Sequence, residues 1–355
     1  MKPENMSDQS IENFADGPRL LADIGGTNAR FGLETGPDKI GAIWVTECAG
    51  HPTLSAAISH YLAQSATVAA GGNQVRLAGI AIANPIDGDL VRMTNHHWSF
   101  SIEAVRVQFG WDSLTVVNDF KALASSLPYL SQHQKQKVGG GAERAGAAIG
   151  LVGAGTGLGV SGLVQMGERW IALDSEGGHS SFAPANEREI DILLFARRHY
   201  EHVSNERLVS GIGLTLIHQA LADKKKVGAV NISAPEILER GLRENCGLCK
   251  ESLEIFCEIL GTIASNVAIT LGAKGGMYIG GGIVLRMGEY FARSGFRQRF
   301  EQKGRFSSYM AEIPTYVITE EFPALIGMSA MLSLANGDSG KKRPSDAHAA
   351  ATVVR

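Results

Sequence analysis

The sequence has 355 residues, more than one hydrophobic core usually organises, so we expect two domains with a cleft between them as the place for a site. Hydrophobic residues make up 44% and charged residues 19%, which is the balance of an ordinary globular enzyme and excludes disorder of the whole chain. The net charge of −3, without a concentrated Lys/Arg face, argues against a nucleic-acid partner and favours small polar substrates.

The sequence shows neither a signal peptide nor a membrane-spanning stretch. Residues 1–17 are polar and acidic, unlike a signal peptide or anchor, and we expect them to form a disordered tail. The apolar stretches elsewhere are interrupted by Gly, Thr or Asn short of a membrane span. The sequence therefore predicts a cytoplasmic protein without a membrane partner.

The four cysteines are too few and too unevenly placed for a disulfide framework. Cys246 and Cys249 have a spacing found in metal sites, but no second Cys pair or His pair lies nearby to complete four ligands. A reduced pair near the start of a helix is therefore favoured over zinc.

The first half of the chain opens with a β-hairpin. Residues 19–24 and 29–33 are expected to form strands joined by a tight turn at Gly25 and Gly26. The elements predicted next are a helix at 54–65, a strand at 76–83, a short helix at 101–109 and a strand at 114–118.

The second half begins with the same pattern after a polar stretch at 131–141. A strand at 147–152, a glycine-rich turn at 153–157 and a returning strand at 158–165 repeat the opening unit, which suggests two similar domains facing each other. The remaining predictions are helices at 187–200, 213–222, 234–243 and 250–271, a strand at 277–279, a strand at 315–318 and a helix at 323–334. We expect a small domain at 18–129, completed by about 320–335, a large domain at 130–319, and a loose tail at 336–355.

The first candidate site is the carboxylate of Asp23, at a strand end beside Gly25 and Gly26. Backbone amides of such a turn can face an anion while the acid faces a metal, a combination that fits phosphate with Mg²⁺. The alternative is a plain Gly-Gly hairpin turn.

The second glycine cluster, residues 153–159, fails as a dinucleotide fingerprint because Leu158 stands where the third glycine would fall. It also lacks the lysine of a P-loop. Its amides can still hold phosphate oxygens, and Thr156 adds a hydroxyl. A purely structural turn is the alternative.

Four further segments are candidates for the site or its lining. Asn118 and Asp119 follow a strand at the mouth of the predicted sheet, where a carboxylate can accept a hydroxyl proton, although Asp119 can equally cap a following helix. Glu176 and His179, separated by two glycines, suit a polyhydroxylated ligand, whereas a lone His is more often structural. Residues 280–282 allow a close approach of adenine or ribose, or serve a turn with positive φ. Residues 94–98 are interpreted as cleft lining with Trp98 as a structural anchor.

Taken together, these segments resemble the bacterial glucokinase family. The resemblance rests on residues 21–30, 94–100, 118–120, 153–159, 176–179, 207–211 and 279–283, and extends from about Leu20 to about Leu334. Ser175 stands where related chains often have glycine, and the Cys-rich zinc segment of the ROK sugar kinases is absent. The resemblance implies two ribonuclease-H-like α/β domains of the actin, hexokinase and heat-shock ATPase superfamily around a nucleotide and sugar cleft.

It also implies roles for individual residues. Asp119 would be the general base that takes the proton of the glucose 6-hydroxyl, and Asp23 would hold Mg²⁺ directly or through water. The sugar ligands would be Asn118, Glu176, His179 and Glu206, the last of which is a plain surface carboxylate by local sequence. ATP would be bound by Ala22, Asp23, Ile24, Gly25, Gly26, Thr27, Asn28, Gly155, Thr156, Gly157 and Gly281.

Two alternatives remain open at this point. One is a kinase for another acceptor, such as mannose, fructose or an amino sugar. The other is a non-catalytic sugar sensor on the same fold. A homodimer is expected because related chains commonly form one, and residues 250–271 are apolar enough to belong to a core or an interface.

Overall fold

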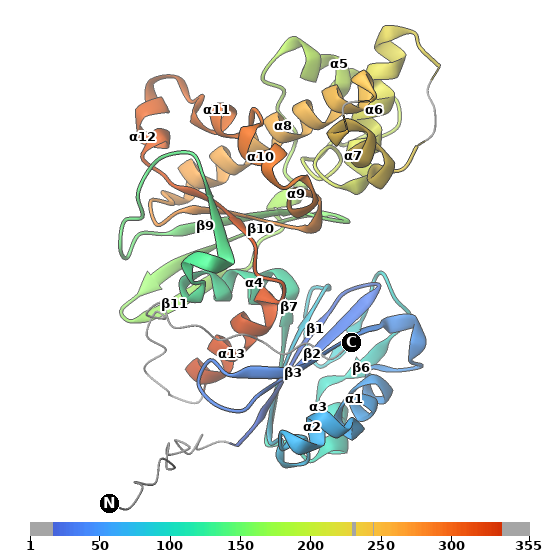
Figure 1. Cartoon of the computed structure of the whole chain (residues 1–355), viewed down its shortest axis with the longest axis vertical. Coiled ribbons are helices and arrows are strands. Elements are labelled where there is room, and N and C mark those ends of the chain that lie inside the picture. Colours follow the sequence, from blue (N-terminus) through green and yellow to red (C-terminus); the bar gives the residue numbers. More distant parts are fainter. Residues whose placement is uncertain (1–16, 229–231, 244, 336–355) are drawn as a thin grey trace, which may run out of the picture. The chain divides into compact units, whose positions relative to one another are not determined.

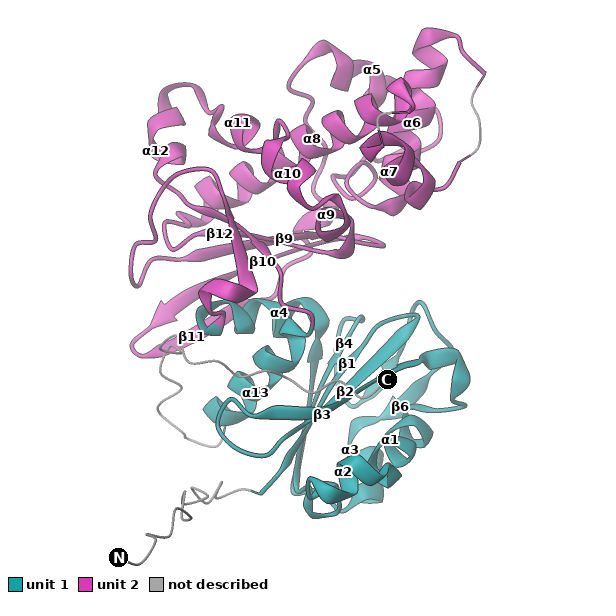
Figure 2. Cartoon of the chain, viewed as in Figure 1, with its two compact units in different colours: residues 1–129, 322–355 teal, residues 130–321 magenta. Residues whose placement is uncertain are grey.

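The computed structural model describes residues 17–228, 232–243 and 245–335. The tails expected at the two ends therefore lie outside the described residues, apart from Gly17. Figure 2 shows the two compact units of the chain: unit 1 consists of residues 1–129 and 322–355, and unit 2 of residues 130–321. Unit 2 is thus inserted into the chain of unit 1.

The elements of each unit follow in chain order. In unit 1 they are β1 Arg19–Ile24, β2 Asn28–Glu34, β3 Ile40–Glu47, α1 Leu54–Ala63, α2 Ser65–Ala69, β4 Leu77–Ile82, β5 Leu90–Arg92, β6 Ser99–Ser101, α3 Ile102–Phe109, β7 Ser113–Asn118, α4 Asp119–Ser126 and α13 Pro323–Ala335. In unit 2 they are β8 Lys135–Val138, β9 Ile149–Ala154, β10 Leu158–Met166, β11 Arg169–Leu173, α5 Glu187–Ala196, α6 Gly211–Lys225, α7 Ala234–Leu242, α8 Gly247–Leu271, β12 Met277–Gly280, α9 Gly282–Met287, α10 Glu289–Arg293, α11 Phe296–Glu301, α12 Ser307–Ala311 and β13 Thr315–Ile318.

The large sheets of the two units have the same topology (Figure 1). The strand order is β3-β2-β1-β4-β7 in unit 1 and β11-β10-β9-β12-β13 in unit 2, where β8 adds an antiparallel edge beyond β13. The strands β1, β2 and β3, like β9, β10 and β11, form antiparallel neighbours, and the next two strands of each order, β4 and β7 or β12 and β13, pair in parallel. This duplication confirms the internal repeat and the two similar α/β domains predicted from the sequence.

The first sheet is covered on both faces because successive side chains of a strand point in opposite directions. Leu20 and Ile24 of β1 pack into the core formed with α1 and α3. Leu21, between them in sequence, packs with Leu325 of α13 on the other face. Burial on both faces explains why β1 reads as a continuous apolar run.

A buried polar network fastens α13 to the first hairpin. The Arg19 guanidinium, only 1% exposed, donates a 2.8 Å hydrogen bond to the Ser333 hydroxyl and lies 3.7 Å from a carboxylate oxygen of Glu34. The Ser329 hydroxyl donates to the same carboxylate. Buried charges are tolerated only when they are paired. The network therefore links β1, at the start of unit 1, to α13, its last helix.

The core of unit 2 is built around α8, which packs against α6, α7 and α11. Ile255, Phe256 and Leu260 on this helix are fully buried. By length and composition alone α8 could cross a membrane, which corrects the expectation that no apolar stretch approaches a span. However, 61% of its apolar window is buried inside the unit, as expected for a core helix.

Several elements were not predicted from the sequence. The polar stretch at 131–141 contains β8, an edge strand in which Gln136 and Lys137 are exposed. The strands β3 and β11 also lie at sheet edges, where half-exposed side chains weaken the alternation that predicts a strand. The strand predicted at 147–152 is shifted by two residues, so the second glycine turn contains only residues 155–157.

Candidate functional site

The carboxylate of Asp23 lies near the carboxyl end of β1, where it faces Arg30 across the hairpin. The two side chains form an ion pair with 3.1 Å between Nη1 and Oδ2. Burial raises the pKa of Asp23, while the charge and hydrogen bond of Arg30 act to lower it. Arg30 therefore sets how readily this carboxyl group stays ionised.

The first glycine turn is packed tightly against its surroundings. The Thr27 carbonyl accepts a 2.8 Å hydrogen bond from the Cys48 N–H, and the Cys48 thiol donates to the Gly25 carbonyl. Neither glycine of the turn has a positive φ, and a Cβ on Gly26 would lie 3.0 Å from Cβ of Asn95. The glycines thus serve close packing of the turn, and the alternatives of a phosphate-binding turn and a plain Gly-Gly hairpin turn both stay predictions.

The loop that supplies Asn95 is anchored by Trp98. This side chain is 2% exposed, and its indole N–H donates a 3.0 Å hydrogen bond to the His51 carbonyl. The prediction that Trp98 is a structural anchor with a satisfied indole is confirmed.

Asp119 lies at the same edge of the first sheet as this turn. Ile24 of β1 pairs in register with Ile82 of β4, which in turn pairs with Asn118 of β7. Because the three strands are parallel, their carboxyl ends line up, and β7 lies two strands, about 10 Å, from β1. Unit 1 therefore brings Asp23 and Asp119 to one edge of its sheet.

Asn118, and not Asp119, is the N-cap residue of α4. Its Oδ1 accepts hydrogen bonds from the N–H groups of Phe120 and Lys121 at 2.9 and 3.3 Å. Asp119 is the first residue of the helix, and its Oδ1 accepts from the Phe120 N–H at 2.8 Å. The N-cap position considered for Asp119 thus belongs to its neighbour.

The second glycine turn joins β9 to β10 and is enclosed by other segments of unit 2. The Gly155 carbonyl accepts a 2.9 Å hydrogen bond from the N–H of Gly211, the first residue of α6. Glu206 Oε2 accepts a 2.9 Å hydrogen bond from the Leu158 N–H, and a Cβ on Gly157 would lie 2.4 Å from that oxygen. The turn thus has a carboxylate at one end and a helix N-terminus at the other.

The position of Glu206 depends on two segments that are paired in space. Residues 203–206 run alongside residues 178–182, with 2.9 Å hydrogen bonds from Phe182 N–H to Val203 O and from Glu206 N–H to Gly178 O. A Cβ on Gly178 would lie 1.9 Å from the Leu158 carbonyl oxygen, so this segment sits directly on the start of β10.

The three polar side chains predicted to bind a sugar from this unit lie together. Nδ1 of His179 is 4.0 Å from Oε1 of Glu206, and its Nε2 is 3.9 Å from Oε2 of Glu176. His179 and Glu176 are 62% and 73% exposed, and Glu206 is 30% exposed. An imidazole between two accessible carboxylates provides hydrogen-bonding groups for adjacent hydroxyls.

Gly281 has a position that only glycine can occupy. Its φ is +94°, and a Cβ would lie 2.1 Å from the carbonyl oxygen of Ala154, the last residue of β9. The loop after β12 therefore crosses over the strand end that leads into the second glycine turn. This agrees with the positive-φ alternative and places the loop beside Gly155.

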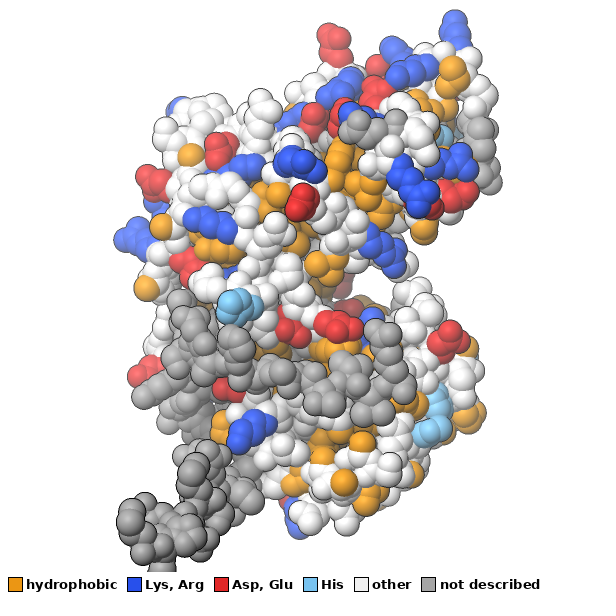
Figure 3. All heavy atoms as spheres, viewed as in Figure 1, with side chains coloured by type: hydrophobic (Ala, Val, Ile, Leu, Met, Phe, Trp, Pro, Cys, Tyr) orange, Lys and Arg blue, Asp and Glu red, His pale blue; other side chains and the backbone are white. Residues whose placement is uncertain are grey.

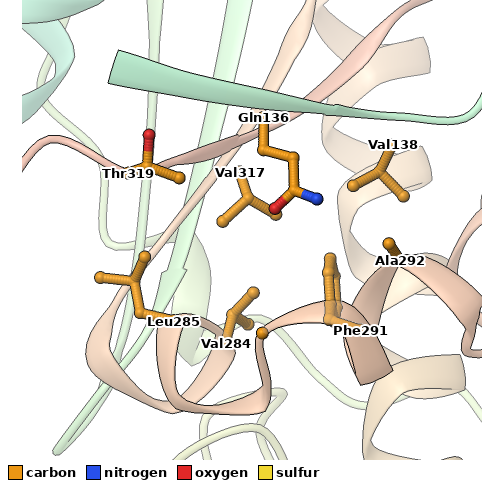
Figure 4. A pocket seen from close by; sticks show the side chains of 9 residues that line it. Gln136, Val138, Val284, Leu285, Phe291, Ala292, Val317 and Thr319 are labelled. Atoms are coloured by element: carbon orange, nitrogen blue, oxygen red, sulfur yellow. The ribbon is translucent and has the colours of Figure 1, made fainter. Parts of the chain in front are cut away.

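A cavity of about 190 Å³ lies in unit 2 between α9 and α10 on one side and β8 and β13 on the other (Figure 4). The side chains of Gln136 and Thr319 add polar groups to an otherwise apolar wall that includes Val284, Phe291 and Val317. The cavity contains none of the predicted site residues, although α9 begins immediately after Gly281.

Charged side chains are mixed on the visible face of unit 2. Figure 3 shows basic side chains interspersed with acidic ones there. Ion pairs in this unit include Arg188 with Glu258 and Arg198 with Asp223.

Comparison with known proteins identifies the family. The family model described as Glucokinase matches residues 20–335. The chain belongs to the glucokinase family. The glucokinase of Chromobacterium violaceum is 52% identical over 316 residues, which cover 89% of this chain and 89% of that protein. The crystal structure of a glucokinase from an Antarctic psychrotroph has a TM-score of 0.81 and 35% identity, covering 89% of this chain and 99% of that one.

Other glucokinase relatives are longer. The bifunctional protein glk of Paraburkholderia xenovorans is 56% identical over 321 residues, which cover 90% of this chain and 49% of that protein. The chain thus spans about half the length of such relatives. The family and the solved structure confirm the expected fold class, the actin-like ATPase fold of sugar kinases with duplicated ribonuclease-H-like domains.

The residues around Asp23 fit a metal ion that is bound mainly by a nucleotide. Among the described residues, no group of three or more His, Cys, Asp or Glu side chains could hold an ion, and Oδ1 of Asp23 accepts no hydrogen bond there. Mg²⁺ usually keeps several waters and binds through one or two carboxylates plus nucleotide phosphates. Asp23 suits such an ion and does not form a dedicated metal site.

Sequence reasoning missed Arg30 as a member of the candidate site. The signal was available, because a hairpin that turns at residues 25–27 places residue 30 opposite residue 23. The role of Gly211 at the second turn carried no such signal, since it depends on where α6 begins in space.

Proposed function

We propose that this chain is an ATP-dependent glucokinase that transfers the terminal phosphoryl group of ATP to the 6-hydroxyl of glucose. The family match over residues 20–335 and the relatives named glucokinase support a hexose kinase. Transfer to a hydroxyl needs an acceptor site with a base, a phosphate site and exclusion of water. Each of the first two requirements has candidate residues in the described chain.

Asp119 is proposed as the general base, and its position in α4 is the observation that supports the function best. The carboxylate stands in the first turn of α4, directly after the N-cap residue Asn118, and its Oδ1 shares the Phe120 N–H with Asn118. It also shares a sheet edge with the first glycine turn. There it would accept the proton of the sugar 6-hydroxyl as that oxygen attacks phosphorus.

The sugar would be recognised by Asn118 together with Glu176, His179 and Glu206. The contacts of His179 with both carboxylates support this assignment, because paired acceptors and donors suit neighbouring hydroxyls. Glu206 would link sugar and phosphate sites, since its other oxygen already holds the Leu158 N–H of the second glycine turn.

The phosphates of ATP would bind at the two glycine turns, with Gly281 near the adenosine. The N-terminus of α6 beside Gly155 supports a phosphate site, because the first amides of a helix favour an anion. Asp23 would hold Mg²⁺ directly or through water. When bound, the ion would neutralise charge on the phosphate oxygens.

The substitution Asp119→Asn tests the base. It should leave glucose affinity unchanged and lower turnover by at least ~100-fold, the usual contribution of a general base. Calorimetry with glucose and a coupled ADP-release assay measure the two quantities, with Asp112→Asn, an exposed carboxylate of the same unit, as the control. Near-normal turnover of Asp119→Asn would remove the assignment.

A panel of sugars separates the proposal from its alternatives. Glucose should give the highest kcat/KM among glucose, mannose, fructose and an amino sugar. A kinase for another acceptor would prefer a different sugar, and a sensor would bind sugar without releasing ADP.

Cytoplasmic location and a homodimer stay predictions. The residues at 250–271, considered for a dimer interface, belong to α8 in the core of unit 2, so an interface would have to use other surfaces.

A further inference from the structure

Two thiols meet at the start of α8, apart from the proposed active site. Cys246 is the N-cap residue of this helix, and its sulfur accepts a 3.2 Å hydrogen bond from the N–H of Cys249. Cys246 is partly exposed, whereas Cys249 is fully buried. The pair therefore consists of one accessible sulfur and one sulfur behind it, both within the first turn.

The surroundings of Cys246 stabilise a thiolate. Burial acts to raise the pKa of its thiol, but hydrogen bonds from the Cys249 side chain and from the N–H groups of Cys249 and Leu248, with the charge of Arg240, outweigh it. The net effect is a pKa below the ordinary value, as is typical of reactive cysteines at helix N-termini. Lys225 of α6 and Glu251 of α8 pair with each other.

Cys249 behaves in the opposite way. Burial, reinforced by the hydrogen bond and charge of Cys246, raises the pKa of its thiol to about 12. A Cβ on Gly241 of α7 would lie 3.0 Å from the Cys249 carbonyl oxygen, so α7 packs closely over this residue. Cys249 is thus shielded from outside reagents but hydrogen-bonded to its neighbour.

Cys257 provides an internal comparison on the same helix. It is fully buried, its thiol donates to the Met287 sulfur, and burial raises the pKa of its thiol to about 12. That is the behaviour of a cysteine that serves only packing. Cys246 differs from it in exposure, hydrogen bonding and charge environment.

We propose that Cys246 and Cys249 form a redox-active dithiol that closes reversibly to a disulfide. With a peroxide, the Cys246 thiolate would attack one oxygen and become a sulfenic acid as the other oxygen leaves as water or alcohol. The Cys249 sulfur would then attack the Cys246 sulfur and expel water, so two thiols are oxidised by two electrons while the peroxide is reduced. A low-molecular-weight thiol would reverse the reaction through a mixed disulfide.

The local geometry favours closure. Residues three apart are neighbours on a helix surface, and the Cys249 N–H already contacts the Cys246 sulfur. Cys246 lies at the N-cap with non-helical backbone, so it can adjust without breaking the helix ladder. A metal is the other use of such a pair, but among the described residues no third Cys, His, Asp or Glu completes a group.

Peptide mapping of the whole protein tests the proposal. Trypsin releases residues 244–250, which contain both cysteines of the pair, while Cys48 and Cys257 fall in other peptides. After treatment with one equivalent of hydrogen peroxide under native conditions, this peptide should lose two hydrogen atoms in mass and regain them with dithiothreitol. Peptides with Cys48 and Cys257 should keep free thiols. Oxidation of those thiols first, or no disulfide in residues 244–250, overturns the proposal.

Single variants test the order of the two steps. Cys249→Ser should accumulate a sulfenic acid at Cys246 that dimedone traps, whereas Cys246→Ser should react little, because the buried Cys249 thiol cannot start the reaction. In the reduced wild-type protein, iodoacetamide should alkylate Cys246 at least tenfold faster than Cys257. Equal rates, or equal reactivity of the two variants, contradict the assigned roles. Circular dichroism confirms that each variant is folded.

Discussion

The two glycine turns arise from the same strand, turn, strand unit but are held in place differently. The first is stabilised by the pair of Asp23 and Arg30 across its own hairpin and by contacts with Cys48 and Asn95 of the same unit. The second is enclosed by distant segments, which contribute Glu206, Gly211 and the loop at Gly281. Duplication of a fold thus preserved the backbone path, while the groups around each turn diverged. The second turn should depend more strongly on its surroundings than the first.

The largest effect is expected for Gly281→Ala. The added Cβ would meet the Ala154 backbone, and the residue has positive φ, so we expect a loss of about 3 kcal/mol in the free energy of unfolding. Urea denaturation measures this loss. Gly282→Ala is the matched control, because a Cβ there meets nothing within 4 Å, and it should change stability little.

The first turn provides the contrast. A Cβ on Gly25 would lie 3.3 Å from the Asn28 carbonyl oxygen, a contact that a small shift relieves. Gly25→Ala should therefore destabilise less than Gly281→Ala. Equal losses in both variants would contradict the difference between the turns.

Glu206→Ala should have the next largest effect, on catalysis. The variant leaves the Leu158 N–H without its acceptor and removes a carboxylate from His179. Hydrogen bonds to a charged group contribute about 1.5–3 kcal/mol, so kcat/KM for glucose should fall by about 10- to 150-fold. Steady-state kinetics measures it, with the exposed Glu201→Ala as the control. An unchanged kcat/KM would separate Glu206 from the proposed sugar site.

Arg30→Met examines the first turn. Loss of the guanidinium removes a charge that lowers the pKa of Asp23, so the carboxyl group should be protonated at higher pH. The acidic limb of kcat/KM for ATP should move to higher pH, with a loss of about threefold to tenfold on that limb that shrinks as the pH rises. Arg76→Met, which removes an exposed arginine of the same unit, should leave the profile in place. A uniform loss at all pH values would point to a role in packing.

The smallest effect concerns His218 on α6, the helix that begins at the second turn. Burial, assisted by Arg240, lowers the pKa of this imidazole. The unfolded chain therefore binds a proton more readily, and stability falls as pH decreases below the unfolded value of about 6.5. His218→Gln should remove up to about 1.4 kcal/mol per pH unit of that dependence between pH 7 and 5. Denaturation at pH 7 and pH 5 measures the pH dependence of stability, with the exposed His199→Gln as the control. The same pH dependence in wild type and His218→Gln would exclude this role.

Prediction from sequence succeeded where local pattern decides the structure. The buried strands β1 and β4 and the half-buried β7 were readable as apolar runs, and so was the repeat of strand, glycine turn and strand. Edge strands such as β8 were missed because their exposed faces carry no apolar alternation. The four short helices α9 to α12 also have too few turns to show a period.

The same distinction applies to the candidate site. Asp23 lies near the end of a strand and Asp119 follows one, so both could be found from their neighbours in sequence. Glu206 had no local signal and entered only through the resemblance to a family, because its position depends on pairing between residues 203–206 and 178–182. The structure was needed to show which of Asn118 and Asp119 caps α4, because both residue types are good caps.

The insertion of unit 2 into unit 1 has a consequence for synthesis. All of unit 2 leaves the ribosome before α13, which supplies Leu325 to one face of the first sheet and Ser333 to the buried Arg19. Until those last residues emerge, that face of the sheet is incompletely covered and the arginine lacks one of its partners. Unit 2 can therefore be completed before unit 1, although the synthesis of unit 1 begins earlier.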